Sequence, residues 1–107
     1  MYNVIIIFFA GIREITQTKE IRVEFEQGDL TLQDIIIYLI EKYKKLREIL
    51  FKGVPSSQVE AYLGKKIDFQ ITQVKFAINR KITTQSSQKV TISDGDVIAM
   101  FLPLIGG

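Results

Sequence analysis

The sequence predicts an α+β fold, in which a mixed β-sheet carries one main helix packed across one of its faces. Three observations predict it. A β-branched and aromatic run occupies residues 2–9, a helical period follows between residues 31 and 50, and strand-like segments return between residues 74 and 102. The 107 residues suffice for a single domain, 1–107, with one hydrophobic core.

Two N-terminal segments have the alternation of β-strands. Residues 2–9 are apolar on both faces, which is typical of a strand covered on both sides or of one whose second face meets a partner. Residues 20–26 instead alternate apolar with charged side chains, as a half-exposed strand does. We expect Ile21, Val23 and Phe25 to face inward from this second strand.

The main helix is predicted over residues 31–50. Thr31 is placed as its N-cap, and Asp34 three positions later resembles the second half of a capping box. Apolar side chains then recur at helical spacing, which predicts one buried stripe toward the core. The stripe consists of Leu32, Ile35, Ile36, Leu39, Ile40, Tyr43 and Leu46.

The segment that follows, residues 51–73, is predicted to be an irregular insertion. Its beginning has the glycine, proline and serine content of a loop. Farther along, residues 59–63 and 67–71 each fit either a short helix or a strand. An insertion of this length could also cover the second apolar face of the first strand from within the chain.

Further strands are predicted at residues 74–79, 90–92 and 97–102, the last after a turn at Asp94 and Gly95. A right-handed crossover places the first and last strands side by side and parallel. A β-grasp, ubiquitin-like fold accounts for this order of elements. The tail, residues 103–107, would then leave the sheet as a flexible continuation of its last strand.

Composition excludes several function classes. The net charge is only +2 and basic residues alternate with acidic ones, which argues against nucleic-acid binding. No apolar run approaches the roughly 20 residues that span a bilayer, so we expect no membrane contact and a cytoplasmic location. Cysteine and histidine are absent, which removes thiol nucleophiles, imidazole bases and the usual zinc sites. Asp94 and Asp96 have turn composition, so no metal site is expected.

The last two residues, Gly106 and Gly107, are the most distinctive chemical feature. Glycine has no Cβ, so two in succession let a backbone thread a channel too narrow for other residues. The four residues 104–107 reach about 13 Å when extended, at roughly 3.3 Å per residue. A carboxylate on Gly107 is therefore suited to delivery into another protein's active site, although a frayed terminus would also fit.

Three separated segments resemble the MoaD/ThiS-like sulfur carriers, in particular the small subunit of molybdopterin synthase. Residues 8–14 (FFAGIRE) are similar to the strand-end motif of that family, and residues 31–50 resemble its capped helix. Residues 76–79 with 93–97 resemble its closing hairpin, and the two terminal glycines resemble its active terminus. The residues just before the glycines differ, because the family usually has a Pro-Pro pair there.

The resemblance implies a chemistry for the tail. A ubiquitin-activating-like adenylyltransferase would adenylate Gly107 with ATP and Mg²⁺, and sulfur would then replace the adenylate to give a thiocarboxylate. This chain has no phosphate-binding loop, so we expect the nucleotide to belong to the partner and no cofactor to bind here. The carrier would donate its sulfur in molybdopterin biosynthesis, within a complex with a larger synthase subunit. Thiamine or another thiolation pathway is a variant of this hypothesis.

Two other functions fit the same features. A ubiquitin-like protein modifier would be conjugated through Gly107 to lysines, and a plain interaction module would use no tail chemistry. The resemblance also assigns residues to roles. Its active terminus corresponds to Gly106 and Gly107, and its partner contacts correspond to Phe9, Ile82, Phe101 and Leu104.

Overall fold

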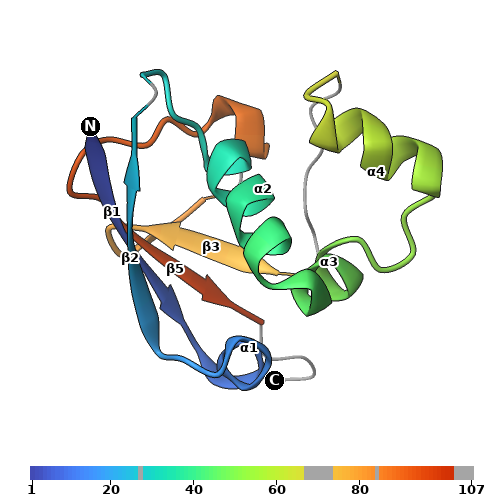
Figure 1. The fold of residues 1–107 in the computed structure, drawn as a ribbon, viewed down its shortest axis with the longest axis horizontal. Coiled ribbons are helices and arrows are strands. Elements are labelled where there is room, and N and C mark those ends of the chain that lie inside the picture. Colours follow the sequence, from blue (N-terminus) through green and yellow to red (C-terminus); the bar gives the residue numbers. More distant parts are fainter. Residues whose placement is uncertain (27, 67–73, 84, 103–107) are drawn as a thin grey trace.

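The computed structural model describes residues 1–26, 28–66, 74–83 and 85–102. Within them, a mixed sheet carries helices on one side (Figure 1). In chain order the elements are β1 (Tyr2–Phe8), α1 (Ala10–Thr16), β2 (Glu20–Phe25), α2 (Leu32–Lys42), α3 (Lys44–Leu50), α4 (Ser56–Leu63), β3 (Lys75–Ile78), β4 (Lys81–Ile82), the 3₁₀ turn η1 (Ser87–Lys89) and β5 (Val97–Phe101). None of the helices in these ranges is long and apolar enough to cross a membrane.

The strands lie in the order β2-β1-β5-β3-β4. The first and last strands are parallel neighbours, with Ile6 opposite Ile98, and this prediction is confirmed. The other pairings, β1 with β2, β3 with β5 and β3 with β4, are antiparallel. Because β5 is a central strand, the chain leaves the sheet from its middle rather than from an edge.

Helix α2 packs its apolar stripe onto one face of the sheet, and Val4, Ile6 and Phe8 of β1 are buried beneath it. Its start is the predicted capping box. The Thr31 N–H donates to Asp34 Oδ2 at 2.9 Å, and the Asp34 N–H donates to Thr31 Oγ1 at 3.4 Å. Each of these bonds satisfies a backbone donor that the first helical turn would otherwise leave unpaired.

The prediction of one continuous helix to residue 50 is wrong, because the helix is interrupted at Tyr43. This residue has φ −121° and ψ 89°, which is not helical, and α3 begins directly after it. The Tyr43 ring packs edge-on against Phe8 with the ring centroids 5.8 Å apart. The change of direction at Tyr43 keeps Leu46 and Leu50 buried. Packing in the core, rather than the helical spacing of apolar residues in the sequence, therefore determines where α2 ends.

Three sequence-based assignments of strands and helices need correction. β1 ends at Phe8, and the unpredicted helix α1 begins after Phe9. The unpredicted strand β4 pairs with β3. Residues 90–92 form no strand of the sheet, because their backbone bonds to the entry of α2 instead: the Leu32 N–H donates to the Val90 carbonyl at 2.9 Å.

The predicted irregular insertion contains a regular helix, α4, and this decides residues 59–63 in favour of helix. Residues 67–71 lie outside the described ranges. Helix α4 lies on the far side of α2 from β1 and β2 (Figure 1). Its Val59 and Tyr62 are buried, and Tyr62 packs against Phe51 with the ring centroids 5.3 Å apart. The described part of the insertion therefore adds to the helical layer.

Candidate functional site

The sheet face turned away from α2 carries a row of apolar side chains across four strands. The register places Ile7 opposite Ala99, Ala99 opposite Ala77, and Ala77 opposite Ile82. Directly paired residues point to the same face of a sheet, so these four side chains are neighbours. Ile98, which precedes Ala99 in β5, points to the opposite face, toward the core, and is fully buried.

We call this surface the open face. It consists of Ile5, Ile7, Ala77, Ile82, Val97, Ala99 and Phe101. Ile82 is 61% exposed, Ala77 is nearly buried at 7%, and the other five residues are partly exposed, whereas the core residues on the opposite face are nearly inaccessible. Charged side chains border it, since Glu20 and Arg22 of β2 pair with Ile7 and Ile5. An exposed apolar patch with a charged border is typical of a protein interface.

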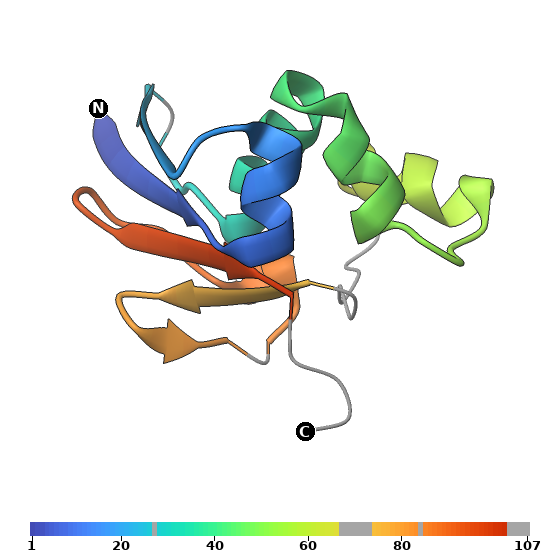
Figure 2. The same ribbon diagram turned by 90° about the horizontal axis from the view of Figure 1, so that it is seen from below.

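The tail begins at the end of β5 that lies next to α1 (Figure 2). Helix α1 is tied to this end of the sheet: the Phe9 N–H donates to the Met100 carbonyl at 3.1 Å, and Arg13 Nε donates to the Phe8 carbonyl at 3.2 Å. Leu102, the first residue after β5, is 37% exposed and lies against Gly11 of α1. Leu102 is therefore positioned beside this helix.

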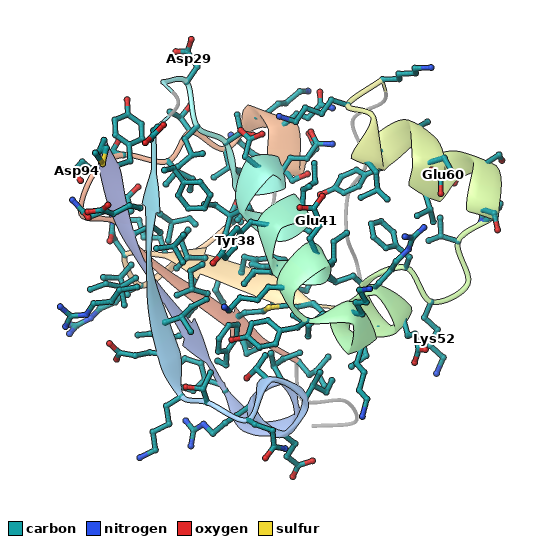
Figure 3. The ribbon with its side chains drawn as sticks, viewed as in Figure 1. Asp29, Tyr38, Glu41, Lys52, Glu60 and Asp94 are labelled. Atoms are coloured by element: carbon teal, nitrogen blue, oxygen red, sulfur yellow. The ribbon has the colours of Figure 1, made fainter. Side chains whose placement is uncertain are left out.

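The turn before β5 lies at the opposite end of the sheet, where Figure 3 shows Asp94 beside the start of β1. Asp94 Oδ1 accepts a hydrogen bond from the Asn3 N–H at 2.7 Å. Asp96 accepts from the Ser93 N–H at 2.7 Å and from Asn79 Nδ2 at 2.8 Å. These carboxylates close the turn, as expected from its composition. Over the described ranges, no group of three or more acidic side chains could hold a metal ion.

The sequence from residue 6 to residue 107 matches the model of the ThiS family. The chain belongs to the ThiS family. No curated protein matches it at a significant level. The matched range contains the open face apart from Ile5, together with the end of β5 beside α1 and the terminal glycines.

Solved structures show the fold of this ThiS-family chain. A putative molybdopterin converting factor subunit 1 from Pyrococcus furiosus is similar over 97% of this chain and 100% of its own, with 20% identity and a TM-score of 0.69. The small archaeal modifier protein 1 from Methanosarcina acetivorans is similar over 100% and 98%, with 22% identity and a TM-score of 0.69. The fold is therefore the predicted ubiquitin-like β-grasp.

A third similarity is to a complex. The complex of subunits 1 and 2 of the molybdopterin-converting factor from Helicobacter pylori contains a chain with 18% identity and a TM-score of 0.55 to this one. The similarity covers 98% of this chain and 99% of that one. The resemblance inferred from the sequence to MoaD/ThiS-like carriers is confirmed at the level of the family by the match to the ThiS family model.

The structure brings two of the predicted partner contacts together. Phe9 follows Phe8, and Phe101 follows Met100, which is the residue paired with Phe8, so the two aromatic residues lie at the same end of the sheet. Phe9 is 43% exposed. Ile82 lies on β4, three strands away from β1, at the far end of the open-face row. The remaining predicted residues, Leu104, Gly106 and Gly107, lie outside the described ranges.

Sequence reasoning missed the contribution of α1 to the site. The residues of this helix appeared only as part of a family-like motif, FFAGIRE, without an assigned structure. A usable signal for a contact at this helix is the single glycine in the motif, Gly11. Glycine weakens a helix, and a glycine that nevertheless lies in one often leaves room for another group to pack closely.

Proposed function

We propose that this ThiS-family chain is a sulfur carrier in molybdopterin biosynthesis, with Gly107 as the reactive end. The observation that carries the proposal is the position of β5. This strand is central, it ends beside the exposed Phe9, and it carries Phe101 on the open face. A partner that covers the open face would therefore hold the root of the tail, and the five residues 103–107 would extend into that partner.

The proposed chemistry follows from the carboxyl group. An α-carboxyl has a pKa of about 3.5, so at neutral pH it is ionised and is a poor acylating group. In activation, a carboxylate oxygen of Gly107 attacks the α-phosphorus of ATP and pyrophosphate leaves. A sulfur nucleophile then attacks the acyl carbon, and AMP leaves. We assign ATP, Mg²⁺ and the sulfur source to a ubiquitin-activating-like adenylyltransferase, and we place this ATP-dependent step in the cytoplasm.

We assign partner binding to Ile82 and Phe101 on the open face, to Phe9 at the end of the sheet next to Phe101, and to Leu104 in the tail. Complete burial of one large apolar side chain from full exposure contributes about 1.5–3 kcal/mol, so burial of these partly exposed side chains would favour a complex. The Helicobacter pylori similarity supports a second partner, because that small subunit is found with subunit 2 of the same factor. We propose a larger synthase subunit as the equivalent partner here.

The second candidate is a ubiquitin-like modifier, in which a lysine amine rather than sulfur attacks activated Gly107. The similarity to the small archaeal modifier protein 1 favours it. Both candidates require the same adenylation and differ only in the nucleophile that follows.

The test of the shared step is ATP–pyrophosphate exchange with the activating enzyme. One extra residue after Gly107 places the reactive carboxyl in a peptide bond, so this variant should support no exchange. Gly106→Val should also fail, because its branched side chain crowds a channel sized for glycine. The matched control carries the same extra residue before Met1, which is 73% exposed, and should behave as wild type. Normal exchange by the protein extended after Gly107 would reject the proposal.

A further inference from the structure

We propose that Leu102 is seated on Gly11 of α1, and that this contact fixes the direction in which the tail leaves the sheet. We call the contact between these two residues the tail seat. Gly11 is then a positioning residue for activation of the C-terminal carboxyl, although it touches no reacting atom. The inference rests on the proposed function, because it assumes that a partner receives the tail.

The close approach of the two residues carries the inference. A Cβ placed on Gly11 would lie 3.1 Å from Leu102 Cδ1, which is closer than ordinary van der Waals contact. A side chain at residue 11 would require Leu102 to shift by a few tenths of an ångström from this position.

The helix beneath Leu102 is firmly held. Ile12 is fully buried, and Thr16 Oγ1 donates to the Thr18 carbonyl at 3.1 Å in the loop that follows α1. The hydrogen bonds of Phe9 and Arg13 described above tie the start of the helix to the ends of β5 and β1. A side chain that docks on α1 is therefore fixed relative to the sheet and its open face.

The turn into α1 is strained, which indicates a specific geometry. Ala10 has φ +43°, in the left-handed region that residues with a Cβ rarely adopt. Strain of this kind persists only where the surrounding structure imposes it. Here it allows β1 to end and α1 to begin within one residue of Phe9, which brings Gly11 beneath the end of β5.

Control of direction matters because five residues of backbone connect the docking surface to the reacting group. Residues 103–107 separate the seat from the carboxyl of Gly107. If Leu102 were free, the tail would sample many directions in the docked complex, and few would deliver the carboxyl to the nucleotide. Misplacement of a reacting group by about 1 Å can lower a rate on the order of 100-fold.

The kinetic test compares Gly11→Val, Leu102→Ala and the double variant in ATP–pyrophosphate exchange. Each single variant should lower kcat on the order of tenfold, with KM for the carrier little changed because the open face is intact. Both act on one contact, so the double variant should be no slower than the slower single variant. The control is Gly28→Ala, whose added Cβ meets nothing within 4 Å. Wild-type kcat in both single variants, or effects that add fully, would overturn the inference.

A second measurement needs no enzyme. The chain has no cysteine, so Glu48→Cys on α3 and Ile105→Cys in the tail provide two unique spin-label sites. The distance distribution between the labels should broaden when Gly11→Val is added, and Gly28→Ala should leave it unchanged. An identical distribution with and without Gly11→Val would reject the tail seat. If the distribution broadens but no activating enzyme accepts the wild-type chain, the proposed function fails and the seat stands.

Discussion

Gln33 of α2 donates a hydrogen bond from Nε2 to the backbone carbonyl of Tyr62 on α4, at 2.6 Å. Both residues are almost completely buried. The Tyr62 hydroxyl lies 3.1 Å from Ser87 Oγ in the 3₁₀ turn before β5, so one residue of α4 joins two other elements. These contacts make α4 part of the core rather than an appendage.

Gln33→Ala should therefore destabilise the protein. It removes a buried hydrogen bond and leaves a void, which together cost on the order of 1–3 kcal/mol. Gln58→Ala on the exposed side of α4 is the matched control and should be neutral within about 0.5 kcal/mol. Urea denaturation followed by circular dichroism measures both. Equal midpoints for the two variants would show that the bond to Tyr62 contributes nothing.

Leu39→Ala should reduce the free energy of unfolding more strongly. Leu39 lies in the middle of the α2 stripe and is fully buried, so its truncation should cost about 2–5 kcal/mol. Lys42→Ala is the control on the exposed side of the same helix. It should cost no more than about 1 kcal/mol, since its ammonium lies 5.7 Å from the centre of the Tyr43 ring. Similar midpoints for both variants would mean that the buried face of α2 is assigned incorrectly.

Asp34 should make stability depend on pH. Burial by itself raises the pKa of this carboxyl, but hydrogen bonds from the Lys65 ammonium and from the Thr31 N–H and hydroxyl outweigh burial, and the net pKa lies below the ordinary value of 3.8. A pKa that is lower in the folded state stabilises the protein above the unfolded pKa. This stabilisation is lost as the pH falls through the folded value.

The test of this linkage is Asp34→Asn. At neutral pH the variant should be less stable by about 0.5–2 kcal/mol, the usual contribution of a helix cap. The difference from wild type should stay constant down to about pH 4 and shrink below it. Chemical denaturation at a series of pH values measures the difference. A gap that persists undiminished at pH 2 would contradict the role assigned to Asp34.

Phe101→Arg should abolish partner binding without unfolding the chain. Phe101 is only partly buried, so the free protein can solvate the new charge, whereas a docked partner would bury it unpaired. We expect binding in titration calorimetry to weaken by several kcal/mol, as at an interface hot spot. Gln58→Arg places the same charge on α4, away from the open face, and should bind normally. Unchanged affinity of Phe101→Arg, or its global unfolding, would reject the open face as the partner surface.

Much of the sheet could be predicted because its signals are local. The apolar runs of β1 and β5 are strong, and the capping box marks the start of α2 without ambiguity. The end of α2 could not be predicted from the helical spacing of apolar residues, because the packing of Tyr43 on Phe8 imposes the interruption of the helix. Residues 90–92 looked like a strand, but their backbone partner is the entry of α2, which only the tertiary structure reveals.

The candidate site was predictable in part. The apolar side chains of β1 on both of its faces predicted an apolar second face of the sheet, and the register places Ile5 and Ile7 there. Helix α1 was missed because its seven residues are too few for a helical period and begin at a strained Ala10. The contact of Leu102 with Gly11 joins residues that are distant in the chain, so neither residue signals it alone.

The most direct test of the proposed carrier function is the intact mass of the protein isolated from its native cells. A sulfur carrier should include a population that is heavier by the difference between one sulfur and one oxygen atom, located at Gly107. Alkylation with a thiol reagent should modify only that population, since the chain has no cysteine. A ladder of conjugates joined through Gly107 to lysines, with no sulfur-containing form, would contradict the carrier and support the modifier instead.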